Sequence, residues 1–312
     1  MKSISILVPC YNEEAVLPLF IDSIAPIMAN TDYRRWQLLL IDDGSTDRTL
    51  QIMCEAHQRD PRIEYIELSR NYGKETALQA GIDYVAGDAV VIMDADLQHP
   101  VSVIPEMIEK WEAGFDDVYA RRITRGKESW ARKVLTKCYY RLLQSVAQTN
   151  VYPNVGDFRL LDRCCINALR SMKETNRYTK GMYGYIGFRK TYVDFDQRER
   201  IAGQSKWNYH SLFKLALNGL LSSTTLPLKL STYLGLIVSL AAFVYMLYVL
   251  LKAALFGDPV QGFPTLMVTI LFLGGVQLLS LGIIGEYIGR IFTESKKRPN
   301  YFVRTYNGKK TE

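Results

Sequence analysis

The first 120 residues alternate between short apolar runs and longer amphipathic stretches. The apolar runs predict strands at residues 4–8, 37–41, 62–68 and 89–93. The stretches between them predict helices at residues 13–28, 46–57 and 74–85. Strands that alternate with helices are typical of a mostly parallel sheet with helices on both faces. We therefore predict an α/β fold, and the lack of a Gly-x-Gly-x-x-Gly after the first strand argues against a dinucleotide-binding domain.

The pattern changes near residue 230. Residues 233–251 and 263–285 contain no charged side chain. Each stretch is long enough to cross the roughly 30 Å core of a bilayer as a helix. A buried helix of that length in a soluble protein normally has a polar stripe. We therefore predict two transmembrane helices, at about 233–254 and 263–287.

Charges on either side of these helices predict their orientation. The connection between them contains Asp258 and no Lys or Arg, whereas the segment after residue 291 contains six Lys and Arg residues. Because loops rich in Lys and Arg stay in the cytoplasm, we predict a multi-pass inner-membrane protein with both termini cytoplasmic. The predicted organisation is a cytoplasmic domain (1–228), a transmembrane hairpin (229–290) and a basic cytoplasmic tail (291–312).

Two further segments, near 129–148 and 207–221, have apolar residues on one helical face and basic residues beside it. Such helices can lie in the membrane interface. They can equally pack their apolar faces on the core of the cytoplasmic domain. Both interpretations remain open from the sequence.

The composition narrows the class of protein. With 48% hydrophobic and 22% charged residues, the chain is expected to fold. The net charge of +6 is modest and no nucleic-acid motif accompanies it, so a nucleic-acid partner is not expected. The five Cys form no C-x-x-C and are odd in number, which favours a reduced compartment. No signal peptide is expected, because a strand pattern begins directly after Met1-Lys2.

Polar side chains follow each predicted strand. The most informative are Asp94 and Asp96, which come directly after the apolar run 89–93. Ligands of open α/β sheets bind at the carboxyl edge of the strands, and two carboxylates there can hold a hard divalent cation. The alternative is a pair of solvated turn carboxylates. If the ligand is a nucleotide, an aromatic such as Tyr11 can stack on its base, and a carboxylate such as Glu13 can accept hydrogen bonds from its ribose.

In these strand-end stretches the sequence resembles glycosyltransferase family 2. The matching stretches are residues 8–13, 41–45, 71–74 and 93–100. More narrowly it resembles the polyprenyl-phosphate glycosyltransferases, which include dolichol-phosphate mannose synthase and bacterial undecaprenyl-phosphate glucosyltransferases. The distal stretches that carry this resemblance are 156–159, 200–207 and 281–290. The resemblance implies a GT-A (nucleotide-diphospho-sugar transferase) fold with interfacial amphipathic helices, followed by the two-helix transmembrane hairpin.

The resemblance also implies an activity. It is the inverting, metal-dependent transfer of a sugar, with glucose from UDP-glucose as the first choice, to a polyprenyl (undecaprenyl) phosphate for cell-envelope glycan modification. Mg²⁺ or Mn²⁺ is the implied cofactor. The implied partners are the nucleotide-sugar donor, the lipid phosphate, the membrane and further copies of the chain, with a tetramer as one candidate. UDP-N-acetylglucosamine, a 4-amino-pentose donor and GDP-mannose remain open as donors.

Roles are carried over to the positions that match the family's motifs. The nucleotide-sugar pocket corresponds to Pro9, Tyr11, Glu13, Asp42, Asp43 and Asp94. The metal motif corresponds to Asp94 and Asp96, with Gln98 as a further ligand. Asp157 corresponds to the acidic residue near the reacting centre, either as a base or as an orienting group. Candidates for binding the acceptor phosphate or the diphosphate, rather than ordinary surface charges, are Arg122, Arg132, Arg200 and Lys206.

Two other functions are weighed against this one. A processive polysaccharide synthase would need more membrane spans and a Q-x-x-R-W motif, where this chain has residues 204–207 as Gln-Ser-Lys-Trp. A non-catalytic membrane protein that only binds a nucleotide sugar would not need the carboxylate pair together with Asp157 and the basic residues.

Overall fold

The computed structural model describes residues 2–29, 35–123, 155–175, 177–196 and 262–310, with scattered helical residues between 233 and 255. The chain divides into two compact units. The first consists of Met1–Ser222 and Pro299–Glu312, and the second of Ser223–Arg298. The predicted amphipathic segments, 129–148 and 207–221, lie outside the described residues.

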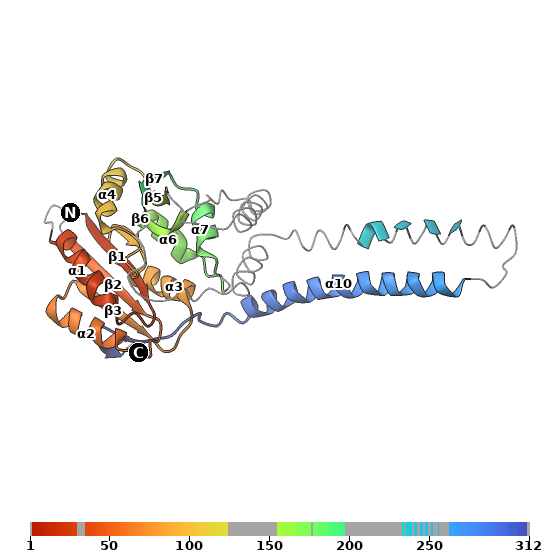
Figure 1. The fold of residues 1–312 in the computed structure, drawn as a ribbon, viewed down its shortest axis with the longest axis horizontal. Coiled ribbons are helices and arrows are strands. Elements are labelled where there is room, and N and C mark those ends of the chain that lie inside the picture. Colours follow the sequence, from red (N-terminus) through yellow and green to blue (C-terminus); the bar gives the residue numbers. More distant parts are fainter. Residues whose placement is uncertain are drawn as a thin grey trace. The chain divides into compact units, whose positions relative to one another are not determined.

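The first unit is built on one sheet (Figure 1). Its described strands follow the order β7-β5-β6-β4-β1-β2-β3-β8-β9. The central strands are parallel neighbours: β1 (Ser3–Cys10), β2 (Arg35–Asp42), β3 (Ile63–Leu68) and β4 (Ala89–Ile92). Most of their residues are apolar and buried, because both faces of this part of the sheet are covered. The four predicted strands are confirmed.

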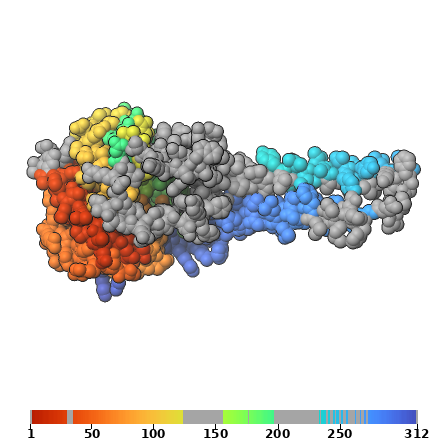
Figure 2. Space-filling view, viewed as in Figure 1, coloured from red at the N-terminus to blue at the C-terminus, as the bar shows by residue number. Residues whose placement is uncertain are grey.

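Alternate residues of the central strands face two hydrophobic cores. The core that contains Val8 also contains residues of α1 (Leu17–Met28), α2 (Thr49–Arg59) and α4 (Ile104–Glu112), which follows the short turn η1 (Val101–Val103). The core that contains Leu7 also contains residues of α3 (Lys74–Tyr84), α6 (Arg163–Ser171) and α7 (Thr179–Tyr185). Helices therefore cover both faces of the sheet, as predicted. In the space-filling view, red and orange residues of the N-terminal part of the chain adjoin the yellow residues around α4 (Figure 2).

The first helix begins later than predicted. The Glu13 carbonyl accepts the N–H groups of Val16 and Leu17, at 3.0 and 2.9 Å, so a turn precedes the helix. α1 then starts at Leu17 with a proline in its first turn, where the missing N–H costs no hydrogen bond. Residues 13–16 therefore belong to the loop at the carboxyl edge of the sheet.

The sheet is mixed rather than mostly parallel. β6 (Val155–Asp162) runs antiparallel between β4 and β5 (Asp117–Arg122), and β7 (Lys190–Phe195) pairs with β5 in parallel. β6 can occupy this place because it supplies Phe158 to one core and Leu161 to the other. The expectation of a mostly parallel sheet is correct only for β1 to β4.

The C-terminal residues belong to the sheet. β8 (Val303–Tyr306) pairs antiparallel with β3, and β9 (Lys309–Lys310) pairs with β8. Asn307 and Gly308 join them with φ of 48° and 76°, which is the geometry of a tight two-residue hairpin turn. The Tyr306 hydroxyl bonds to Glu64, and the Asn307 side chain accepts the Tyr65 N–H at 2.8 Å. Residues 303–310 are thus part of the first unit's fold, where the sequence indicated only a basic tail.

The second unit contains one long helix, α10 (Phe263–Ser295), of 33 residues. Within the part of the chain that the structure describes, its segment Phe272–Ser295 is the one helix long and apolar enough to cross a membrane. This agrees with the predicted span at 263–287, and α10 continues past it. Between 233 and 255 only scattered helical residues are described, so the first predicted span is not shown as a continuous helix.

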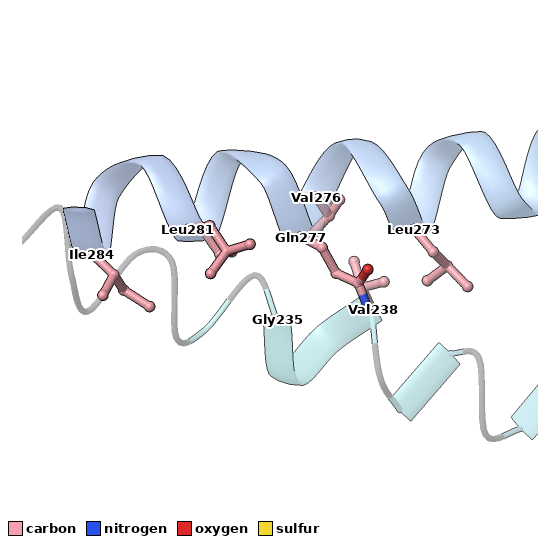
Figure 3. A pocket seen from close by; sticks show the side chains of 8 residues that line it. Gly235, Val238, Leu273, Val276, Gln277, Leu281 and Ile284 are labelled. Carbon is pink, nitrogen blue, oxygen red and sulfur yellow. The ribbon is translucent and has the colours of Figure 1, made fainter. Parts of the chain in front are cut away.

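A groove of about 580 Å³ lies between α10 and the described helical residues near 235 (Figure 3). Gly235 and Val238 line one side of it. The α10 side is mostly apolar and is lined by Leu273, Val276, Gln277, Ser280, Leu281 and Ile284. Small and apolar residues facing each other in this way are typical of helix packing within a membrane.

Candidate functional site

The carboxyl ends of the parallel strands meet at one edge of the sheet. Cys10 is paired with Asp42 across β1 and β2, and Leu7 is paired with Ile92 across β1 and β4. The loops that follow these strands therefore start side by side. This is the edge at which open α/β sheets bind their ligands, and we refer to it as the site edge.

The loop after β1 is locked to the loop after β2. Asn12 has φ of 55°, and its side chain accepts the Thr46 N–H at 2.8 Å while its own N–H bonds to Ser45 Oγ at 3.0 Å. The Glu13 N–H donates to Thr49 Oγ1 at 2.8 Å. The sequence assigned Pro9, Tyr11 and Glu13 to the nucleotide-sugar pocket. Pro9 is the penultimate residue of β1, Tyr11 and Glu13 lie on this loop, and all three are half-buried.

Asp42, at the end of β2, is almost fully buried, with 1% of its surface exposed. Its side chain accepts the Ser45 N–H at 3.2 Å. Burial raises the pKa of the Asp42 carboxyl, and the hydrogen bonds with Ser45 oppose that shift. These contacts fix the position of Asp42 at the site edge, and its role in a donor pocket stays a prediction.

Asp43 ties the loop after β2 to the start of α3. Its two carboxylate oxygens accept the N–H groups of Tyr72 and Gly73 at 2.7 and 2.9 Å. The approach is close because a Cβ on Gly44, whose φ is +67°, would lie 2.5 Å from backbone atoms of residues 70–71. Asp43 therefore holds the start of α3 in place. This structural role is separate from the donor-pocket role predicted for Asp43.

Three charged side chains from three elements meet at the site edge. Lys74, the first residue of α3, places its Nζ 2.6 Å from Asp94 Oδ1 and 2.9 Å from Asp157 Oδ2. Asp94 follows β4, and Asp157 lies near the start of β6. The ladder between these antiparallel strands ends at the pair of Ile92 and Arg159, and Asp94 and Asp157 each lie two residues beyond that pair. The predicted metal-motif and reacting-centre carboxylates are thus brought together.

The charges of this cluster stabilise one another. Burial opposes ionisation of Asp157, but the nearby ammonium groups of Lys74 and Lys180 hold the pKa of its carboxyl well below its usual range. Burial likewise opposes the charge of Lys74, but the carboxylates of Asp157 and Asp94 raise the pKa of its ammonium. Asp157 is 8% exposed, whereas Lys74 and Asp94 are 42% and 31% exposed.

The loop after β4 holds Asp96 and Gln98 half-buried beside Asp94. The Gln98 N–H donates to Asp96 Oδ1 at 3.2 Å. Buried His99 anchors the loop by stacking on Phe158, with ring centroids 4.8 Å apart. Burial lowers the pKa of the His99 ring, which favours its neutral form.

The oxygen donors at this edge fit a divalent cation. Carboxylate and amide oxygens, which Asp94, Asp96 and Gln98 offer, are the ligands that Mg²⁺ and Mn²⁺ accept. Among the described residues, Asp157 Oδ1 is also buried without a hydrogen-bond partner, so this wall of the site has an unused acceptor. An ion at Asp94 would meet Lys74, which already contacts that carboxylate.

Of the four predicted phosphate-binding residues, the structure describes one. Arg122 is half-buried at the end of β5. Both β5 and β4 are antiparallel to β6, so Arg122 lies at the site edge. Arg132, Arg200 and Lys206 lie outside the described residues.

Sequence reasoning missed two residues of this site. Lys74 lies in the matching stretch 71–74 and His99 in the stretch 93–100, but the sequence predicted a role for neither residue. A lysine where the loop after a strand meets the next helix is a usable signal for a cation at the site edge. The ring of His99 stacks on Phe158, which is distant in the sequence, and a local sequence pattern cannot predict such a contact.

The mixed sheet with helices on both faces is a GT-A-like α/β fold. Comparison with known proteins agrees: the model of glycosyl transferase family 2 matches residues 5–169. The chain belongs to this family. A model described as the GtrB C-terminal hairpin matches residues 226–291.

Individual relatives align over nearly the whole chain. "Uncharacterized glycosyltransferase sll0501" of Synechocystis is 44% identical over 300 residues, which cover 96% of this chain and 94% of that protein. "Prophage bactoprenol glucosyl transferase homolog" of Escherichia coli K12 is 40% identical, covering 96% and 98%. "Bactoprenol glucosyl transferase" of Shigella phage SfV is also 40% identical, with the same coverage.

Proposed function

We propose that this glycosyltransferase moves glucose from UDP-glucose to undecaprenyl phosphate and inverts the configuration of the sugar. The main support is the cluster of Lys74, Asp94 and Asp157 at the site edge. The names of the bactoprenol glucosyl transferases, which align over nearly the full length of both chains, support the lipid acceptor and the glucose.

In the proposed reaction, an oxygen of the lipid phosphate attacks the anomeric carbon from the face opposite the nucleoside diphosphate. A divalent cation held by Asp94, Asp96 and Gln98 would supply positive charge for the leaving diphosphate. The phosphate is already ionised near neutral pH, so it needs no general base. We therefore assign Asp157 to orienting the acceptor or a sugar hydroxyl.

Two anionic substrates must approach each other in this reaction. We assign Arg122 at the site edge, with Arg132, Arg200 and Lys206, to holding their phosphates, because guanidinium and ammonium groups offset the repulsion and fix the geometry of attack. The pocket of Pro9, Tyr11, Glu13 and Asp42 is assigned to the uridine of the donor. Asp43 contributes by fixing the adjacent loop.

The acceptor lipid requires a membrane, and we propose that the chain is a multi-pass inner-membrane protein. The apolar helix α10 and the match of residues 226–291 to a hairpin model support two spans. The basic residues after α10 support cytoplasmic termini and a cytoplasmic catalytic unit. Self-association, with a tetramer as one candidate, completes the proposal.

The identity of the donor is tested with purified full-length protein in nanodiscs that contain undecaprenyl phosphate. The protein is incubated with each of a set of labelled nucleotide sugars. The set comprises UDP-glucose, UDP-N-acetylglucosamine, a 4-amino-pentose donor and GDP-mannose. We expect Mn²⁺- or Mg²⁺-dependent label in the lipid fraction with UDP-glucose, and at least about tenfold less with the others, because differently shaped donors lose pocket contacts. Transfer from another donor alone would replace glucose in the proposal. No transfer from any donor would overturn it.

A further inference from the structure

We propose that Lys74 is a positioning residue that joins the two halves of the site. Its ammonium links the carboxylate of Asp94, on the metal-motif loop, to that of Asp157, at the reacting centre. If a divalent cation binds Asp94, Lys74 would remain paired with Asp157 and would hold that carboxylate in position. This inference rests on the proposed function for the meaning of the two carboxylates.

The geometry is built into the fold. The contacts of 2.6 and 2.9 Å are short, as charge-assisted hydrogen bonds are. Lys74 begins α3, and the residue before it, Gly73, has φ of 93°, a conformation that side chains disfavour. Asp43 holds the Tyr72 and Gly73 N–H groups, so the backbone that presents Lys74 has a fixed position.

The charge of Lys74 is needed where it lies. Without it, the carboxylate of Asp94 would face the buried carboxylate of Asp157 as a like charge. The neighbouring guanidinium of Arg159 is engaged elsewhere, since its Nη1 lies 3.1 Å from a carboxylate oxygen of fully buried Asp117. Lys74 is therefore the described cation that contacts both site carboxylates.

The two contacts of Lys74 differ in access to water. Asp94 is 31% exposed and can be reached by an incoming ion, whereas Asp157 is 8% exposed. A cation that binds Asp94 competes with Lys74 for that carboxylate only. The competition predicts that removing the ammonium does not weaken metal binding, although it misplaces Asp157 and slows transfer.

The proposal is tested by measuring metal binding and turnover separately in the same variants. Mn²⁺ binding to the full-length protein in nanodiscs is titrated by electron paramagnetic resonance for wild type, Lys74→Met and Lys74→Arg. Lys110→Met is the matched control, because Lys110 also forms an ion pair, with Glu106 at 3.2 Å, but on α4. The same four proteins are assayed for sugar transfer.

For Lys74→Met we expect kcat to fall about 100-fold, the cost of a misplaced reacting group, with Mn²⁺ bound as tightly as in wild type or more tightly. Lys74→Arg should recover about a tenth or more of the wild-type kcat, because it restores the charge. Lys110→Met should match wild type in both measurements. A kcat for Lys74→Met within threefold of wild type, or Mn²⁺ affinity that falls along with kcat, would overturn the proposal.

Asp157→Asn gives a second route if Lys74→Met does not fold. With Asp157 neutral, Lys74 should pair more strongly with Asp94 and compete better, so Mn²⁺ should bind about three- to tenfold more weakly. Unchanged or tighter Mn²⁺ binding in Asp157→Asn would contradict the linkage. The Mn²⁺ titrations need neither sugar nor lipid, so they test Lys74 even if the wild-type protein transfers no glucose.

Discussion

Two acidic clusters lie at opposite edges of the same sheet, and their carboxylates have different partners. At the site edge, Asp94 and Asp157 share the ammonium of Lys74. At the other edge, Asp116, Asp162 and Cys164 place ligand atoms within 4.8 Å of one another, close enough to share an ion. Spacing alone would make both of them candidate metal sites.

The partners separate the two clusters. Asp162 accepts the indole N–H of Trp111 at 2.7 Å and the N–H of Cys164 at 2.8 Å, where it caps α6. Asp116 accepts the Arg189 N–H at 3.0 Å. These donors are fixed by the fold and cannot leave, whereas an exposed lysine can give way to an arriving cation. We therefore interpret the cluster at the site edge as the candidate functional site and the second cluster as structural.

The largest expected contrast is in turnover. Asp157→Asn keeps the shape of the side chain and removes its charge, so kcat for sugar transfer should fall about 100- to 1000-fold. Asp162→Asn, the matched change at the other edge, should stay within about twofold of wild type. Steady-state assays of the two variants, with thermal unfolding to check folding, measure the difference. Near-wild-type turnover in Asp157→Asn would remove Asp157 from the reaction.

The next contrast is in stability. Asp162→Ala removes the cap of α6 and leaves the Trp111 indole without its acceptor, so it should lower the free energy of unfolding by about 1–2 kcal/mol. Urea denaturation of the variant measures this. If stability is unchanged, the hydrogen bonds to Asp162 do not carry the role assigned here.

A smaller effect is expected with pH. Burial opposes ionisation of Asp162, but the Cys164 N–H and the Trp111 indole lower the pKa of its carboxyl below the ordinary value of 3.8. A lowered pKa means that the stabilisation is present above pH about 4 and is lost as pH falls through the folded-state pKa. The stability difference between wild type and Asp162→Asn should therefore shrink below pH 4. Screening by solvent keeps it under about 1 kcal/mol, and a difference that grows on acidification would contradict the assignment.

The smallest effect is expected at Cys164. Its Sγ lies 3.9 Å from Asp116 Oδ1, a weak contact, and the N–H that bonds to Asp162 belongs to the backbone. Cys164→Ser should therefore change stability by less than about 0.5 kcal/mol and leave Mn²⁺ binding unchanged. Weaker Mn²⁺ binding in this variant would identify the second cluster as a metal site after all.

The sequence predicted the strands that have a local apolar pattern and missed those that depend on contacts distant in the chain. β1 to β4 each contain a run of mostly apolar, buried residues, so pattern alone located them. After Val155, β6 continues with Gly156, Asp157, Phe158 and Arg159, which is not an apolar run. Its antiparallel place depends on contacts with β4 that local pattern does not encode. β8 is only four residues long and is stabilised by pairing with β3, some 240 residues earlier in the chain. The Asn307-Gly308 turn was the available signal for it.

The sequence likewise predicted some residues of the candidate site and not others. Asp94 and Asp96 stand out because they follow a buried strand directly. Asp157 came from a family resemblance, since nothing in its own surroundings suggests a reacting group. The link through Lys74 joins positions 74, 94 and 157, and only the folded chain brings them together.

The central claim is that the site-edge cluster, and not its counterpart, supports transfer of glucose to a lipid phosphate. The most direct measurement is Mn²⁺-dependent transfer of labelled glucose from UDP-glucose to undecaprenyl phosphate by wild type, Asp96→Ala and Asp162→Ala in nanodiscs. We expect wild type and Asp162→Ala to label the lipid in Mn²⁺ and not in a chelator, and Asp96→Ala to give no label. Label formed by Asp96→Ala at the wild-type rate, or none formed by a folded Asp162→Ala, would contradict the claim.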